Sequence, residues 1–402
     1  MNEKLGYGQI ISFSLLALAI SMVWSLNIIF MPLLVTRELT VSAFKIGFLV
    51  SLASLASLLF SPLVGHFSDR LVTPLGRRHP IIMAGTVLAI IFLIILPGLK
   101  GYTQIAILAF FLFAAVASME ISFYALIPEI IPRTQLGRGV SILTILRYSG
   151  SALIMVLGGV AWKINYTYPF YIVAIFILIG SAVTLAEARG HLSLEIKRES
   201  KKMSLKEIWR DLRTKRDITN FYRAQFFWNF ALASIFPFLF VYLKARYGVE
   251  IGESYKWVPL VAVIGFLTVL VAGLATDRWG HKKTLTLGLA VLVISIPLNL
   301  IKWPAHQGIF FLGLGIIPVL MVLSQAPAYL SHLIPTGREG EFFGYDNFSI
   351  TLAQLPGAWI SGLLIDRFGY PAMFCLSSAA ALVSLVFALR NLASLDYSLY
   401  CE

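Results

Sequence analysis

The sequence predicts an all-α integral membrane protein in which twelve transmembrane helices form two six-helix repeats. Three observations predict this class. The 402-residue chain is 58% hydrophobic and 13% charged, with a mean hydropathy of +0.83, which excludes an ordinary soluble globular protein. Its apolar runs are long enough to cross a bilayer, and a charged turn in the first half recurs in the second.

Each apolar run is close to the ~20 residues that span ~30 Å of hydrocarbon as a helix. The first run follows a single lysine and has no small-residue cleavage site, so we interpret it as a retained helix and not as a signal peptide. The twelve runs cover approximately residues 8–35, 43–64, 80–99, 103–128, 139–162, 168–187, 219–243, 255–275, 284–302, 307–333, 342–365 and 370–390.

The repeated turn has the form Gly-x-x-x-Asp-Arg, followed by a glycine and basic residues. It begins at Gly65 in the first half and at Gly273 in the second. Three further short matches keep nearly the same offset: Leu126-Ile127-Pro128 with Leu333-Ile334-Pro335, Met31-Pro32 with Phe236-Pro237, and Tyr168-Pro169 with Tyr370-Pro371. Four matches in one order predict a repeat of about half the chain.

The repeat sets the predicted domains. We expect a six-helix bundle at 1–187, a cytoplasmic linker at 188–217 and a second bundle at 218–402. The linker is charged and amphipathic around Trp209, which is typical of a helix lying on a leaflet surface. Parallel membrane repeats with an even number of helices indicate a transporter.

The net charge of +12 could indicate a nucleic-acid-binding protein, but its distribution indicates a membrane topology. With both termini on one side, 22 of the 32 Lys and Arg residues lie on that side and nine on the other, and Arg147 lies within an apolar run. Because positive charge marks the cytoplasmic side, we expect cytoplasmic termini and a multi-pass protein of the cell membrane. The lipid bilayer is an expected partner and nucleic acid is not.

Other classes of site are not expected. Cys375 and Cys401 are too few and too badly placed for a disulfide framework, and we expect no metal site and no cofactor. The sequence holds no Ser/His/Asp, metal-ligand or Gly-rich phosphate arrangement that can be placed, so an enzyme is disfavoured.

Two charged residues are predicted at the same depth of the membrane. Glu120 lies nine residues before Glu129, and Arg147 lies nine residues after Arg138. At a rise of 1.5 Å per residue, both lie roughly 13–14 Å from the cytoplasmic ends of their helices. A charge at that depth costs at least ~2.5–3.5 kcal/mol, so each side chain should face a partner or water.

Two interpretations of Glu120 and Arg147 stay open. A permanent salt bridge could staple their helices together. Replacing a buried ion pair with apolar groups is often neutral or stabilising, however, so stability alone is a weak reason for such a pair. We therefore favour a functional pair, in which the acid couples to protons.

Cargo-binding candidates are polar and aromatic residues of the other runs. Trp24, Asn27 and Met31 share one helix face, where an amide beside an indole suits a polar ligand with an apolar surface. A polar contact between packed helices explains the same pattern equally well. In the second half we expect only neutral hydrogen-bonding groups. The predicted substrate-binding residues are Asn27, Trp24, Tyr148, Gln225, Asn229 and Gln354.

The Asp-Arg turns are predicted to act as cytoplasmic latches. Basic loop residues alone could serve only to fix topology, but that does not explain a repeated Asp-Arg pair. Asp69 and Asp277 would each approach a helix N-terminus, where free N–H groups and a partial positive charge favour a carboxylate. The predicted gating residues are Asp69, Arg70, Arg77, Arg78, Asp277, Arg278 and Arg138.

Tandem six-helix halves with these turns resemble the major facilitator superfamily over nearly the whole chain. The first turn reads Ser68-Asp69-Arg70-x5-Gly76-Arg77-Arg78-x-Pro80. Five residues separate Asp-Arg from Gly-Arg-Arg, whereas most members of the superfamily have one residue there. This long form is similar to plant sucrose/proton symporters, their animal relatives, and the glycoside-pentoside-hexuronide cation symporters.

The resemblance implies alternating-access symport of a neutral sugar or glycoside with protons, by a protein that functions as a monomer. It also implies that Glu120 and Arg147 are the proton-coupling and sugar-binding pair, although the sucrose symporters carry Asp where this chain has Glu. Melibiose-type members place paired acids in the helix that corresponds to 43–64, and this run has none, so protons are favoured over sodium.

Three alternatives to sugar symport remain. A drug or metabolite exporter would share the same fold. A lipid transporter is the second alternative, because lipid carriers also resemble the glycoside symporters. The third is a sensor that has lost transport, but such proteins usually gain a large soluble domain, and this chain has none.

Overall fold

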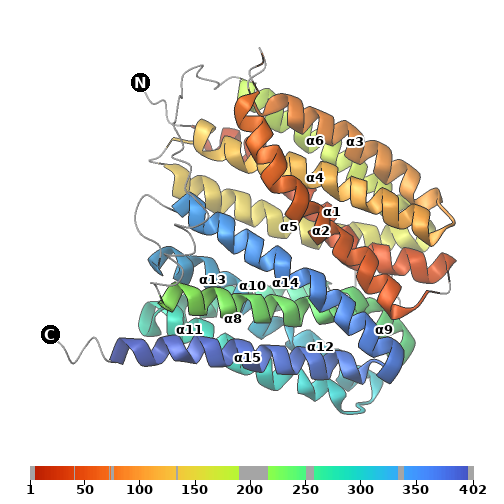
Figure 1. Cartoon of the computed structure of the whole chain (residues 1–402), viewed down its shortest axis with the longest axis vertical. Coiled ribbons are helices and arrows are strands. Elements are labelled where there is room, and N and C mark those ends of the chain that lie inside the picture. Colours follow the sequence, from red (N-terminus) through yellow and green to blue (C-terminus); the bar gives the residue numbers. More distant parts are fainter. Residues whose placement is uncertain are drawn as a thin grey trace. The chain divides into compact units, whose positions relative to one another are not determined.

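The computed structural model describes residues 5–39, 41–71, 73, 77–132, 135–189, 216–249, 258–333 and 339–396. In these ranges every regular element is helical and no strand occurs, which confirms the predicted class. The α-helices (Figure 1) are α1 (Tyr7–Glu38), α2 (Ala43–Arg70), α3 (His79–Ile95), α4 (Tyr102–Ile130), α5 (Leu136–Ile164), α6 (Tyr168–Arg189), α8 (Arg216–Ile235), α9 (Leu239–Tyr247), α10 (Val258–Trp279), α11 (His281–Ser295), α12 (Ala305–Leu314), α13 (Ile316–Leu333), α14 (Glu339–Phe368) and α15 (Pro371–Asp396).

Eleven spans in the described ranges are long and apolar enough to cross a membrane. The 22-residue helix α10 occupies the position of the remaining predicted run. Two predicted runs are each built from two helices: α8 and α9 are joined by a 3₁₀ turn at Phe236–Phe238, and α12 is followed directly by α13. Pro237 lies in the 3₁₀ turn, where its missing N–H interrupts the α-helical ladder.

Contacts between Cα atoms divide the chain into two compact units. The first unit comprises Met1–Val41, Leu49–Arg198 and Val249–Val258, and the second comprises Ser42–Phe48, Glu199–Gly248 and Pro259–Glu402. Helix α2 is therefore shared, because its first turns belong to the second unit and the rest to the first. The predicted linker at 188–217 lies outside the described residues except at its two ends.

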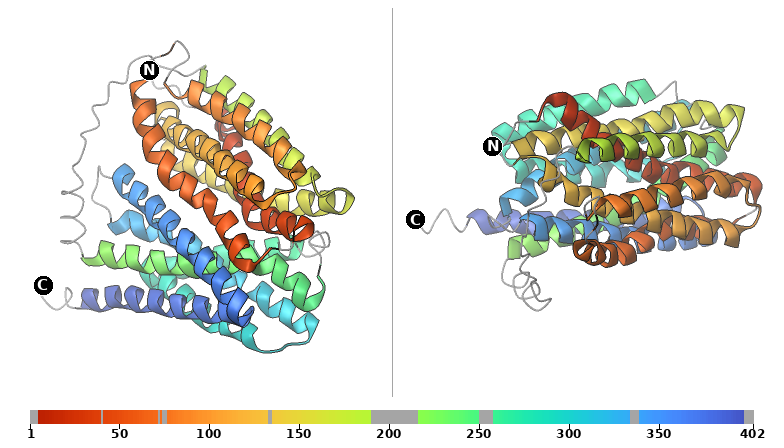
Figure 2. Two further views of the ribbon diagram at one scale, coloured as in Figure 1. Left: turned by 45° about the vertical axis from the view of Figure 1, so that its right-hand side comes forward. Right: turned by 90° about the horizontal axis from the view of Figure 1, so that it is seen from above.

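The first unit contains two packed groups of helices. Helix α1 packs along α5 and α6, and α3 packs along α4 (Figures 1 and 2). A hydrogen bond of 2.7 Å from the Thr86 hydroxyl to the Ser181 hydroxyl connects α3 to α6. Gly150 of α5 lies so close to α1 that an added Cβ atom would collide with the carbonyl oxygen of Leu18.

The second unit is organised around α8, which packs against both α14 and α15 (Figure 2). Three serine hydroxyls on those helices donate hydrogen bonds to backbone carbonyls of α8: Ser361 to Ser234 at 2.6 Å, Ser377 to Ala231 at 2.8 Å, and Ser384 to Ala224 at 2.8 Å. Small residues with hydroxyl groups allow close packing and bind helices together where water is absent.

The beginning of α2 is capped by a carboxylate of α14. Asp366 accepts hydrogen bonds from the backbone N–H groups of Ala43 at 2.7 Å and Phe44 at 2.9 Å. These are first-turn N–H groups, which have no partner within their own helix. Asp366 and Arg367 also follow Gly362 with the spacing of the two latch turns, so the motif occurs a third time, at the end of α14.

Asp366→Ala is expected to lower the free energy of unfolding by ~0.5–2 kcal/mol, the usual effect of removing an N-cap side chain. The measurement is thermal unfolding of the purified protein in detergent. Asp277→Ala is the matched control, because the exposed side chain of Asp277 forms no hydrogen bond or ion pair with the described residues. An equal loss of stability in both variants would contradict a stabilising cap.

Candidate transport site

Glu120 of α4 lies against Trp24 of α1. The indole Nε1 of Trp24 donates a hydrogen bond to Glu120 Oε2 at 3.0 Å, and both side chains are partly buried. The Trp24 ring also packs on Phe113 of α4, with 5.6 Å between ring centroids. Phe113 lies two turns before Glu120, so one face of α4 holds the indole by a ring contact and by a hydrogen bond.

Arg147 of α5 interacts electrostatically with Glu120. Within the described ranges the two side chains form no ion pair at 4.0 Å or less. Tyr124 interacts with both charges, and the Arg147 guanidinium carbon lies 5.9 Å from the centre of the Tyr124 ring. The charges that we expected on neighbouring helices are thus brought together, but the structure does not contain the permanent salt bridge that was one interpretation.

Of the eleven spans, that of α5 is the least buried, because only 17% of the residues in its most apolar stretch are buried. Arg147 and Tyr148 are both exposed, and Thr144 is exposed on the preceding turn. A guanidinium group facing hydrocarbon would be costly, so it should face water or a polar ligand. This part of α5 is therefore the best candidate for a cargo-contacting surface in the first unit.

The predicted cargo residues of the first unit have different surroundings. Trp24 is engaged with Glu120. Asn27 is 2% exposed, and its Nδ2 donates a hydrogen bond of 2.9 Å to the backbone oxygen of Val50 in α2. This hydrogen bond supports a role of Asn27 in packing α1 against α2. Tyr148 is 55% exposed and so available for contact with a ligand.

The second half contains an acidic side chain beside the neutral groups that we expected there. Gln225 and Asn229 are buried on α8, where Asn229 Nδ2 donates to the Gln225 backbone oxygen at 2.9 Å and Gln225 Nε2 donates to the carboxylate of Asp346 in α14. Gln354, also on α14, is half-buried. Asp346 is the only acidic residue in the apolar run 342–365, and that signal was overlooked because the residue lies near the beginning of the run.

One predicted gating residue connects two helix ends in the first unit. Arg78 Nη1 donates a hydrogen bond of 2.7 Å to the buried Ser68 hydroxyl in the last turns of α2. The Nε atom of Arg78 lies 3.7 Å from Glu129 Oε1 near the end of α4. The basic loop therefore links α2 to α4 and does more than mark topology.

The other predicted gating residues lie at helix ends. Asp69 and Arg70 are the last two residues of α2, and Arg77 is exposed just before α3. Asp277 and Arg278 are exposed at the end of α10. Arg138 is exposed on the first turns of α5, with its guanidinium carbon 4.9 Å from the centre of the Tyr7 ring. The latch contacts of Asp69 and Asp277 stay predictions.

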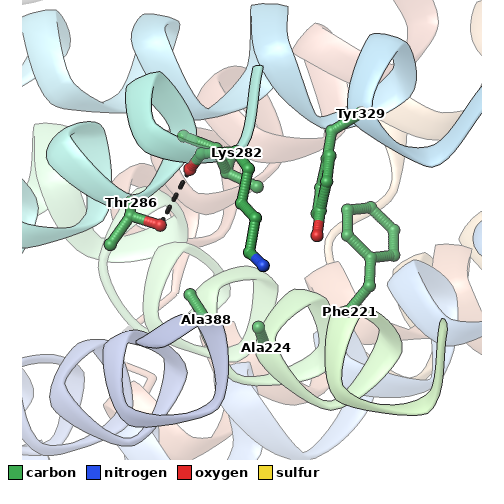
Figure 3. A pocket seen from close by; sticks show the side chains of 7 residues that line it. Phe221, Ala224, Lys282, Thr286, Tyr329 and Ala388 are labelled. Atoms are coloured by element: carbon green, nitrogen blue, oxygen red, sulfur yellow. Dashed lines mark hydrogen bonds between the residues drawn. The ribbon is translucent and has the colours of Figure 1, made fainter. Parts of the chain in front are cut away.

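A small pocket lies within the second unit (Figure 3). Its lining combines Phe221 and Tyr329 with Lys282, whose side chain lies beside Tyr329 and extends toward Ala224 and Ala388. Thr286 donates to the Lys282 backbone oxygen at 2.8 Å in the pocket wall. A volume of about 10 Å³ holds about one water molecule, so this pocket is too small for an organic cargo.

Asn27→Ala is expected to lower stability by ~1 kcal/mol while leaving the apparent affinity for cargo unchanged, because the side chain bonds to α2. Tyr148→Ala should do the reverse, since the exposed ring has little packing to lose. Thermal unfolding and the KM for transport, measured on both variants, test this division. A weakened KM in Asn27→Ala with unchanged stability would restore Asn27 as a cargo ligand.

Comparisons with known proteins agree with this architecture. The model of the family described as Major Facilitator Superfamily matches residues 13–326 and 258–395. The multi-drug resistance efflux pump PmrA of Streptococcus pneumoniae serotype 4 is 24% identical over 392 residues, covering 92% of each chain. The multidrug resistance protein MdtG of Klebsiella pneumoniae is 24% identical over 359 residues, covering 86% of this chain and 83% of the relative. The crystal structure of a D-xylose-proton symporter superposes with a TM-score of 0.72 at 14% identity, covering 94% of this chain and 97% of the symporter.

Proposed function

Because the chain belongs to the Major Facilitator Superfamily, we propose that it carries a neutral sugar or glycoside across the membrane together with protons, by alternating access. It is a multi-pass integral membrane transporter and not an enzyme. The observation that carries the proposal is the placement of Glu120, a membrane-embedded acid that is hydrogen-bonded by Trp24 and lies in the electrostatic field of Arg147.

The proposed coupling depends on the charge of Glu120. While ionised, the carboxylate attracts the Arg147 guanidinium. Protonation removes that attraction, so the guanidinium can direct its fixed fork of N–H donors toward hydroxyl groups of the cargo. Cargo that binds Arg147 in turn favours the protonated form of Glu120. Binding of proton and cargo is therefore mutually reinforcing, which is the requirement for symport.

The proposed cargo surface is the exposed face of α5. Tyr148 supplies an aromatic surface beside Arg147, and Gln354 remains the candidate from the second unit. In this proposal Asp69 and Asp277 close the cytoplasmic side by meeting helix N-termini, which requires cytoplasmic chain ends in the cell membrane. The sugar itself is inferred from the long Asp-Arg turn, which resembles that of sugar symporters.

A second candidate is the proton-driven export of organic compounds. It is favoured by the similarity to PmrA and MdtG over most of their lengths. The same Glu120 and Arg147 would then exchange a proton for cargo. An exposed Arg147 suits neutral or anionic compounds better than the hydrophobic cations that many exporters remove, because like charges repel.

Both candidates are tested with purified protein in proteoliposomes. Uptake of labelled mono- and disaccharides is measured with and without an imposed inward proton gradient, and export of dyes is measured under the reverse gradient. Gradient-dependent sugar accumulation that is lost in Glu120→Gln and kept in Glu187→Gln supports symport. Glu187 is the control acid, at the end of α6. Dye movement without sugar uptake would replace symport by export.

A further inference from the structure

The second unit contains a membrane carboxylate that the proposed mechanism does not use. Asp346 lies in the transmembrane span Tyr345–Phe368 of α14. The Gln225 side chain of α8 donates a hydrogen bond of 2.5 Å from Nε2 to Asp346 Oδ1. Gln225 is 2% exposed, and its Oε1 atom is buried with no hydrogen-bond partner. An amide that uses one end and leaves the other unsatisfied is costly in a buried site.

No Lys or Arg in the described ranges forms an ion pair with Asp346. Arg223 of α8 and Arg390 of α15 both lie over the Phe387 ring of α15, with guanidinium carbons 5.6 and 5.4 Å from its centre. Tyr222 of α8 interacts electrostatically with Asp346 and with Tyr345 of α14. His332 of α13 and His281 of α11 contact each other through tilted rings, with centroids 4.9 Å apart.

A half-buried carboxylate near the beginning of a transmembrane span, with no basic partner among the described residues, favours a cation, which is either a proton or a positively charged ligand. A transition-metal ion fits poorly, because the described residues contain no group of three or more His, Cys, Asp or Glu side chains that could hold one. A proton fits the chemistry of Gln225. Its Nε2–H donates to an ionised Asp346, and after a half-turn of the amide its Oε1 accepts the O–H of a protonated Asp346.

We propose that Asp346 and Gln225 form a second proton-binding site, located in the second unit and distinct from Glu120 in the first. The proposal rests on proton-coupled transport as the function. Asp346 is half-buried, so its proton can exchange with water, whereas Gln225 is sealed inside the unit and can adjust to either charge state. The transport cycle would then move two protons with each cargo molecule.

The first test follows the protons directly and needs no cargo. Infrared difference spectra between acidic and neutral pH record the carbonyl stretching band of protonated carboxylic acids in the purified protein. One component should disappear in Asp346→Asn and another in Glu120→Gln, and both in the double variant. Asp346→Glu should keep its component at a shifted position, which shows that the site tolerates substitution.

Gln225 is tested in the same spectra. Gln225→Leu should shift the Asp346 component, because the amide contacts that carboxyl group. Gln354→Leu, which removes an amide two turns later on α14, should leave the component in place. An Asp346→Asn spectrum identical to that of the natural protein overturns the second site. An unchanged Glu120→Gln spectrum instead overturns the proposed role of Glu120 in proton coupling. The second site is still supported if a component disappears in Asp346→Asn.

The second test measures stoichiometry. With one fewer coupled proton, the limiting accumulation of cargo should fall by about tenfold for each pH unit of imposed gradient. Asp346→Asn is therefore expected to accumulate cargo to a lower limit, set by the one proton that Glu120 still couples. An unchanged limit in Asp346→Asn would show that this carboxyl group carries no transported proton.

Discussion

Glu120→Gln is expected to abolish accumulation of cargo against its concentration gradient while leaving exchange of cargo across the membrane intact. Glutamine has nearly the same volume as glutamate, and its Oε1 can still accept the indole hydrogen bond of Trp24. The substitution removes only the titratable charge. Arg147 is then permanently free of the attraction of Glu120, as in the protonated state of the proposed cycle.

Two measurements separate these effects. Accumulation is followed under an imposed proton gradient, and exchange is followed as counterflow of labelled cargo against unlabelled cargo with no gradient. We expect accumulation to fall at least tenfold, which corresponds to ~1.4 kcal/mol or more of driving force, and counterflow exchange to change little. An equal loss of both activities would mean that Glu120 binds cargo or supports folding and does not couple protons.

Glu120→Asp is the informative companion variant, because the sequence resemblance is to symporters with aspartate at this position. The carboxylate is retained but is one methylene shorter, so the 3.0 Å bond to Trp24 must lengthen unless the helices adjust. Proton-dependent accumulation of cargo should be retained, while the rate of transport falls. Complete loss of accumulation in Glu120→Asp would show that geometry is as important here as charge.

Gly150→Val is expected to cause a large loss of stability in the first unit. An added Cβ would collide with the Leu18 carbonyl oxygen and the Ser21 hydroxyl of α1. A backbone carbonyl cannot rotate away as a flexible side chain does, so α1 and α5 would have to separate. Overpacking usually costs ~1–3 kcal/mol, and separation of two long helices should reach or exceed the upper value.

Thermal unfolding in detergent tests the effect of Gly150→Val, with transport as a second readout. Gly313→Ala in α12 is the matched control, because an added Cβ there would meet no atom within 4 Å. Alanine stabilises a helix by ~0.8–1.0 kcal/mol relative to glycine, so the control should be neutral or slightly more stable. Similar unfolding temperatures for Gly150→Val and the natural protein would contradict the close approach of α1 and α5.

The helical architecture was predictable because run length and hydropathy decide which segments can span a bilayer. The break between α12 and α13 was not, because residues 307–333 are apolar throughout and only backbone geometry reveals it. Glu120 and Arg147 stood out because charges are rare in apolar runs. The role of Asn27 could not be predicted, since its partner is a backbone atom of another helix, and sequence does not say which backbone lies opposite.

The Trp24–Glu120 hydrogen bond connects the two groups of helices in the first unit. Trp24 belongs to the group of α1, α5 and α6, and Glu120 belongs to the pair of α3 and α4, so their hydrogen bond crosses the seam between the groups. Thr86 and Ser181 bridge the same groups with neutral hydroxyls that do not titrate at physiological pH. In the proposed cycle, the Thr86–Ser181 contact is therefore the same in every state, whereas the Trp24–Glu120 hydrogen bond changes in strength as Glu120 gains or loses a proton.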